Sequence, residues 1–150
     1  MKRAEDWHAL AFAQRALVRM YDVSLSVCAL DRTSAVLVRL RDRHASMWAE
    51  LERWVDGARA RTGLLPDERL WTPRAVDDLG ALLTVAKGEG VLLRHCEAAL
   101  AGELPDAADA AVVKLRALVH SNLRCLSRAL VERTWASDRF VIGDRRNGAA

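Results

Sequence analysis

The chain has 150 residues, of which 51% are hydrophobic and 29% are charged, and its formal net charge is +3. This composition is typical of one soluble globular domain with a hydrophobic core, and it excludes a disordered or collagen-like chain. Acidic residues are interspersed among the arginines, and no run of five like charges occurs. The charge pattern therefore does not favour a nucleic-acid or membrane-binding patch.

The cysteines and the N-terminus bear on the cellular compartment. The three cysteines are odd in number, far apart in the sequence and without the CxxC spacing of a zinc or redox site, so we expect free core residues. Charged residues interrupt any signal-like apolar segment near the start. No stretch approaches the roughly 20 apolar residues that a membrane-spanning helix needs. We therefore expect a cytoplasmic protein.

The first half of the chain predicts two helices. Residues 4–30 repeat apolar side chains at steps of three, four and seven, and residues 32–61 show the clearest heptad. Asp31 offers an N-cap between the two helices. His44 stands in the second apolar seam, where an aliphatic residue is expected. The two stripes contain these residues: Leu10, Leu17, Tyr21, Leu25, Cys28, Leu37, Leu40, His44, Met47, Leu51, Trp54 and Ala58.

A third helix is predicted over residues 73–100, after a longer connection that contains Gly63. Gly88 and Gly90 flank Glu89 in its middle, and each glycine costs about 1 kcal/mol relative to alanine in a helix. The two glycines indicate a close backbone approach or a local kink. The predicted buried side consists of Val76, Leu79, Leu82, Leu83, Ala86, Leu93, Cys96 and Leu100.

The fourth helix is predicted from about Asp106 to Arg133. The segment that follows lacks a sustained period, and its Phe140, Val141 and Ile142 are expected to dock on the bundle. We predict one domain over residues 1–137 and a partly disordered tail over residues 138–150. The predicted fold class is all-α, an antiparallel four-helix bundle with up-down-up-down topology.

Three polar residues fall at one depth in that topology. His44, Glu89 and His120 each lie 13 or 14 residues from the predicted turns at one end of the bundle, which is about 20 Å along a helix. Imidazole and carboxylate groups suit Fe, Mn or Zn, so the three residues form a candidate metal site. The alternative is a hydrogen-bonded polar layer in which Glu89 is the partner of a buried His44.

The full ligand set of a helical-bundle di-iron protein is incomplete. That pattern needs a Glu three residues before each of two histidines, whereas Arg41 precedes His44 and Ala117 precedes His120 at that spacing. No GxGxxG, P-loop, GxSxG or HExxH motif is present. The sequence therefore favours a non-enzymatic protein over an enzyme.

The second half of the chain resembles a known family. Gly88-Glu89, the helical run RHCEAALAGELP and a last helix with a central His120 are similar to the ferritin-like family of small, uncharacterised bacterial four-helix proteins. Cys96 lies near the position where that family has an aromatic residue. The similarity covers residues 10–130 or so. It implies a ferritin-like bundle and, by analogy, an ancestral metal layer.

Two functional hypotheses follow. The first is a non-enzymatic helical-bundle binding or structural protein, without a cofactor, that self-associates into a homo-oligomer; Trp48, beside the second seam, would contribute an apolar edge. The alternative is a metal-binding ferritin-like protein with a degenerate single-metal site at His44, Glu89 and His120. An arginine-mediated nucleic-acid binder is the least favoured hypothesis because of the mixed charges.

Overall fold

The structure is a computed structural model, and it describes residues 2–55, 77–102, 104 and 106–147, with side-chain environments for 7–53, 77–102, 104 and 106–133. These residues form four helices and no strand: α1 (Lys2–Val27), α2 (Asp31–Val55), α3 (Asp78–Leu100) and α4 (Asp106–Asn147). The predicted all-α class is confirmed. The predicted second-helix end and the connection to α3, including the seam residues Trp54 and Ala58, lie outside the described side chains.

The start of α3 is fixed to the turn between α1 and α2. The Asp77 side chain caps the helix by accepting a hydrogen bond from the Gly80 N–H at 2.7 Å. The backbone N–H groups of Ala29 and Leu30 donate to the Asp78 carboxylate at 2.9 and 3.1 Å. Helices α2 and α3 therefore begin at the same end of the bundle.

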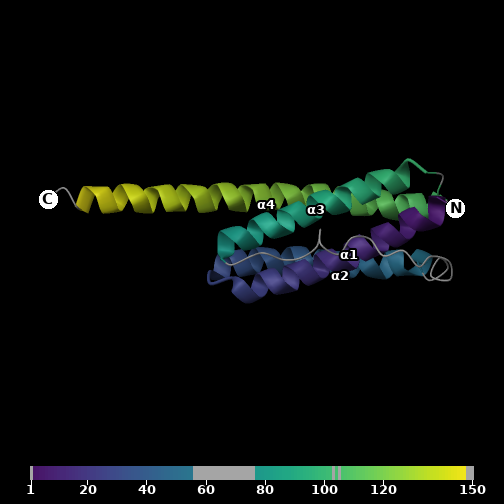
Figure 1. Cartoon of the computed structure of the whole chain (residues 1–150), viewed down its shortest axis with the longest axis horizontal. Coiled ribbons are helices and arrows are strands. Elements are labelled where there is room, and N and C mark those ends of the chain that lie inside the picture. Colours follow the sequence, from purple (N-terminus) through teal and green to yellow (C-terminus); the bar gives the residue numbers. More distant parts are fainter. Residues whose placement is uncertain (1, 56–76, 103, 105, 148–150) are drawn as a thin grey trace.

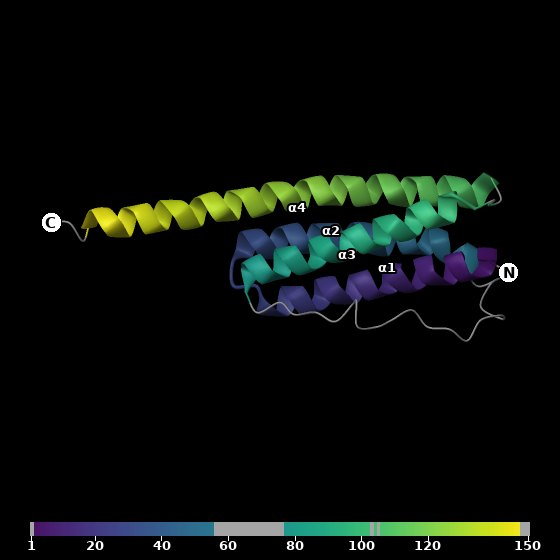
Figure 2. The same ribbon diagram turned by 45° about the horizontal axis from the view of Figure 1, so that its top comes forward.

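Because they share a starting end, α2 and α3 run in the same direction, while α1 and α4 run the opposite way (Figures 1 and 2). The predicted up-down-up-down order is therefore wrong between α2 and α3. Residues 56–76 join them, and 21 extended residues reach about 70 Å, against about 38 Å for the 25 residues of α2. A connection of this length can return along the whole bundle, which a short turn cannot.

Each helix has two neighbours in a square arrangement: α1 packs on α2 and α3, and α4 packs on α2 and α3. The stripes of leucine, valine and alanine close on one core, as the heptads of the sequence predict. The largest fully buried apolar side chains are Tyr21, Leu10, Leu17, Leu37, Leu40, Leu51, Leu82, Leu92, Leu115 and Leu126.

The two glycines of α3 have different environments. A Cβ atom at Gly88 would lie 2.8 Å from Leu17 Cδ1 and 3.1 Å from Met20 Sδ, so α3 approaches α1 closely there. A Cβ atom at Gly90 would meet nothing within 4 Å. The close approach expected from the sequence is confirmed at Gly88 only.

Two expectations about helix faces and ends are wrong. Leu79 and Leu83 were expected in the core, but their side chains are exposed on the outside of α3. Helix α4 does not end near Arg133; it continues to Asn147 and extends past the other three helices without returning to the bundle (Figures 1 and 2). Among the described helices, none combines the length and apolarity required to cross a membrane.

Candidate functional site: a buried polar layer

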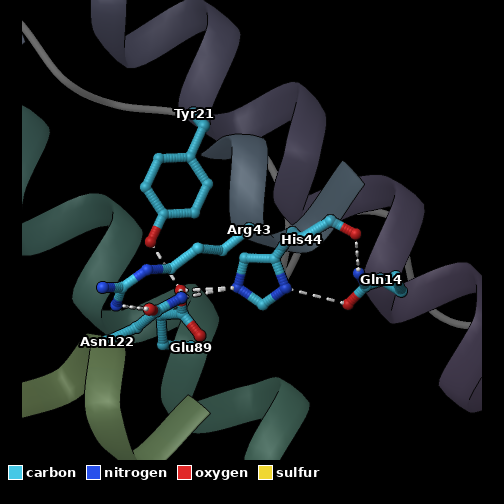
Figure 3. A network of polar contacts seen from close by, with 6 residues as sticks. All are labelled: Gln14, Tyr21, Arg43, His44, Glu89 and Asn122. Carbon is cyan, nitrogen blue, oxygen red and sulfur yellow. Dashed lines mark hydrogen bonds and ion pairs between the residues drawn. The ribbon is translucent and has the colours of Figure 1, made fainter. Parts of the chain in front are cut away.

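Five polar side chains meet at mid-height in the core, and together they form what we call the polar layer (Figure 3). All are fully buried. Each occupies a position in the apolar stripe of its own helix, so the heptad that buries the leucines also buries these groups. The polar layer consists of Gln14 and Tyr21 from α1, His44 from α2, Glu89 from α3 and Asn122 from α4.

His44 is held on both ring nitrogens. Gln14 donates through Nε2 to the backbone carbonyl of His44 at 2.9 Å, which turns the Gln14 Oε1 atom toward His44 Nδ1 at 3.1 Å. On the other side of the ring, Nε2 lies 2.7 Å from Glu89 Oε1. The expected pairing of His44 with Glu89 is therefore confirmed.

Glu89 gathers donors on one of its two oxygens. Tyr21 donates its hydroxyl hydrogen to Glu89 Oε1 at 2.5 Å, and Asn122 donates through Nδ2 to the same atom at 2.9 Å. Asn122 in turn accepts at Oδ1 from the Arg43 guanidinium at 3.3 Å. Glu89 Oε2 is buried and has no hydrogen-bond partner.

The hydrogen-bond partners of His44 require a hydrogen on each side of its ring. Gln14 Oε1 can only accept, so His44 Nδ1 carries a hydrogen. A separation of 2.7 Å between His44 Nε2 and Glu89 Oε1 also requires a hydrogen between the two atoms. The two residues thus form one buried hydrogen-bonded unit. Removal of either residue would leave the other as an unpaired group in the core.

Tyr21 is buried in the same layer, beside Glu89. Burial, together with the negative charge of Glu89 and the hydrogen bond to it, raises the pKa of Tyr21 far above its usual range. Tyr21 therefore stays protonated and acts as a donor to Glu89. Its ring also lies against the His44 imidazole, with centroids 5.9 Å apart and planes tilted by 41°.

The polar layer connects all four helices through side chains. A buried polar group that is partnered costs little, whereas the same group with a missing partner costs about 1–3 kcal/mol. Sliding any helix by one turn would separate these partners, so the layer favours one register and one arrangement of the helices. This is a structural task that the described contacts are sufficient to perform.

His120 does not join this layer. Its side chain is exposed on α4, whereas Asn122, two residues further along, is buried against Glu89. Residues two apart on a helix point in nearly opposite directions, so the correct depth along the helix does not place both in the core. The three-residue site predicted from His44, Glu89 and His120 is therefore not formed.

The remaining polar atoms do not supply a metal site in its place. Both nitrogens of His44 already face Gln14 and Glu89, which leaves no free imidazole lone pair for a metal. No cluster of three or more His, Cys, Asp or Glu side chains suited to a metal occurs within residues 7–53, 77–102, 104 and 106–133, whose side chains are described. The fit to Fe, Mn or Zn is thus poor, with Glu89 Oε2 the one atom of the polar layer that lacks a hydrogen-bond partner.

Two surface hollows are formed by the described residues, and neither reaches the layer. One surface hollow of about 200 Å³ lies between the starts of α2 and α3 and the α4 segment near Ala129, and another follows the exposed side of α2. Neither is lined by a residue of the polar layer. These two hollows therefore give a ligand no route to the five fully buried side chains.

The cysteines and Trp48 have structural settings. Cys96 is buried, and burial raises the pKa of its thiol to about 12. Cys28 and Cys125 are half-buried free thiols. Trp48, expected at an apolar edge, is covered by the Arg15 guanidinium at 4.9 Å from the ring centroid. Burial also raises the pKa of the Cys28 thiol, so neither Cys28 nor Cys96 is activated as a nucleophile.

Comparison with known proteins adds no relationship: no protein-family model, no curated protein and no solved structure matches this chain. The function must therefore be argued from the geometry of the polar layer and from the surface of the bundle.

Proposed function

We propose that this protein is a non-enzymatic helical-bundle binding protein, whose buried polar layer maintains the fold and whose exposed helix faces contact partners. The observation that carries the proposal is that the five side chains of the layer are fully buried and that their donors and acceptors, Glu89 Oε2 excepted, are satisfied by one another. A catalytic centre needs room for a substrate and a group free to react with it. Neither is offered by His44 or Tyr21.

The helix order supports a ferritin-like arrangement as part of this proposal. Such bundles consist of two helical hairpins joined by one long crossover connection. Helices α2 and α3 begin at one end, so residues 56–76 would be that crossover. Without a metal layer, a ferritin-like bundle would retain its architecture as a scaffold for binding.

The metal-binding alternative has one observation in its favour, the unpartnered Glu89 Oε2. It is tested by elemental analysis of protein purified without an affinity tag, and by thermal unfolding with added Fe²⁺, Mn²⁺ or Zn²⁺. Our proposal predicts less than about a tenth of an equivalent of metal and no rise in Tm, because a ligand that binds the folded state must raise Tm. A full equivalent of bound metal would contradict it.

Self-association is the second use that the exposed faces favour, as expected from the sequence. Seven large apolar side chains are more than a third exposed among the described residues, and exposed apolar side chains that cluster mark interaction sites. Sedimentation equilibrium across a wide concentration range tests this. A single monomeric species at the highest concentration would remove self-association and leave a different partner.

A further inference from the structure

A hollow of about 200 Å³ opens at the end of the bundle where α4 extends past the other helices (Figure 1). Its walls come from the first turns of α2, from Leu82 of α3 and from α4 residues around Ala129. We call this hollow the end pocket. It is smaller than the pockets of about 300–1,000 Å³ that hold drug-sized ligands, so its size suits a molecule with few atoms.

One part of the end pocket is apolar. Leu82 belongs to the core and is 1% exposed, whereas Leu30 is 42% exposed. The apolar surface therefore runs from the core to the solvent, and an aliphatic group placed there would be withdrawn from water. This part of the lining consists of Leu30, Val36, Leu82 and Ala129.

The other part of the lining carries charges of both signs. Arg32 and Glu132 are exposed, and Arg133 is half-buried. Asp31 and Arg128 are near in sequence but do not line the pocket. A purely anionic ligand would meet the carboxylate of Glu132, and a purely cationic one would meet two guanidinium groups.

A buried carboxylate holds the walls of the end pocket together. Asp78 accepts hydrogen bonds from the Ala29 and Leu30 N–H groups at 2.9 and 3.1 Å and from the Thr33 hydroxyl, and it faces the charge of Arg133. Burial alone would raise the pKa of Asp78, but these hydrogen bonds and this charge together lower it. Asp78 is therefore ionised at neutral pH, and the walls are in place before a ligand arrives.

With Asp78 included, two carboxylates stand against two guanidinium groups at the end pocket. The local charge is thus balanced while both signs remain accessible on the lining, from Arg32 and Glu132. A ligand that matches this arrangement has no net charge, carries one charge of each sign and has an apolar part.

We propose that the end pocket binds a free α-amino acid with an aliphatic side chain. Its carboxylate would pair with the guanidinium groups of Arg32 and Arg133, and its ammonium group with Glu132. Its side chain would lie on the apolar part of the lining. This inference concerns a small ligand and goes beyond the proposed function, which assigns partners to the exposed helix faces.

The test is isothermal titration calorimetry of the full chain with L-leucine and with three analogues that each lack one feature. 4-Methylpentanoate lacks the ammonium group, 3-methylbutylamine lacks the carboxylate, and glycine lacks the side chain. We expect L-leucine to bind with a Kd of about 1 mM or lower, and each analogue to bind at least about fivefold more weakly.

Variants assign the binding to the end pocket. Arg32→Gln and Glu132→Gln each remove one charge, and Ala129→Leu fills the apolar part, so each should weaken L-leucine binding by about fivefold or more. Glu52→Gln and Arg53→Gln, exposed near the other end of α2, are matched controls expected to change it by less than about twofold. Circular dichroism confirms that each variant is folded.

Three outcomes would overturn the inference: no binding of L-leucine up to about 10 mM, 4-methylpentanoate or 3-methylbutylamine binding as tightly as L-leucine, or control variants as weak as the pocket variants. Equal binding of 4-methylpentanoate would assign the pocket to simple carboxylates. None of these outcomes bears on the proposed function, which bound metal would overturn instead, so the two failures are distinguishable.

Discussion

The polar layer and the exposed outer sides of α3 and α4 share one sequence pattern and differ in their partners. Both place polar residues at heptad positions among apolar ones. Inside, Glu89 and His44 are joined by a hydrogen bond of 2.7 Å and held by three further side chains. Outside, Arg124 and His120 stand in a seam that no other described helix covers. A polar residue in a heptad thus stabilises the fold where its partners are internal, and stays solvated where no described helix covers it.

The largest effect expected from this comparison is at Glu89. Replacement by leucine leaves His44 and Tyr21 in the core without their acceptor, so we expect Glu89→Leu to lower the free energy of unfolding by about 3–5 kcal/mol. Denaturant unfolding followed by circular dichroism measures it. Glu97→Leu, at an exposed site on the same helix, is the control and should change stability by less than about 0.5 kcal/mol. Equal losses at the two sites would contradict the distinction between inside and outside.

Gly88 and Gly90 allow the buried and exposed sides of α3 to be compared by adding one methyl group to each. Gly88→Ala forces a Cβ into the 2.8 Å approach of Leu17, while Gly90→Ala adds it to open space. We expect Gly90→Ala to gain about 1 kcal/mol from helix propensity, and Gly88→Ala to be less stable than Gly90→Ala by about 2 kcal/mol because of overpacking. Thermal or urea unfolding of both variants measures this difference in stability. Equal stabilities would show that α3 is not pressed against α1.

Alkaline pH tests the burial of Tyr21. Its pKa is raised in the folded protein, so above pH 10 the unfolded chain loses the Tyr21 proton while the folded chain keeps it, and stability falls as pH rises. At pH 11 the ionisation of Tyr21 in the unfolded chain lowers the free energy of unfolding by about 1.4 kcal/mol relative to neutral pH. Tyr21→Phe should be less stable at neutral pH but show a smaller loss between pH 9 and pH 11. Since Cys96 titrates in both proteins, the difference between them isolates Tyr21. Parallel pH profiles would contradict the account.

The smallest expected effect on stability is at Leu83. Its side chain is 53% exposed, so Leu83→Asp should change the free energy of unfolding by less than about 0.5 kcal/mol. Urea unfolding measures the stability. A loss of more than about 2 kcal/mol would mean that Leu83 belongs to the core, as first expected from the sequence.

Sequence patterns predicted the four helices, apart from the end of α4, and three of the five residues of the polar layer: Tyr21, His44 and Glu89. The heptad of α2 placed His44 in the core, and two glycines marked Glu89 as a position of close packing. The predicted depth of Glu89 along the bundle was also correct, although the predicted direction of α3 was wrong. Glu89 lies 11 residues from each end of α3, so reversing the helix leaves its height unchanged.

The depth of a residue along a helix does not say which side of the helix it occupies. The residues missed by the sequence analysis depend on that side. Asn122 continues the spacing of Leu115, Val119 and Leu126, a phase signal that identifies it over His120. Gln14 likewise lies between Leu10 and Leu17. The exposed seam of α3 was harder to recognise. That helix is apolar on both faces, and only packing decides which of them is buried.

The central claim is that the His44–Glu89 unit stabilises the fold as a structural pair. A double-mutant cycle tests it most directly, with unfolding free energies for His44→Leu, Glu89→Leu and the double variant. We predict that the double variant loses at least about 2 kcal/mol less than the sum of the two single losses, because each single change leaves an unpaired group in the core. Losses that add within about 0.5 kcal/mol would contradict the claim.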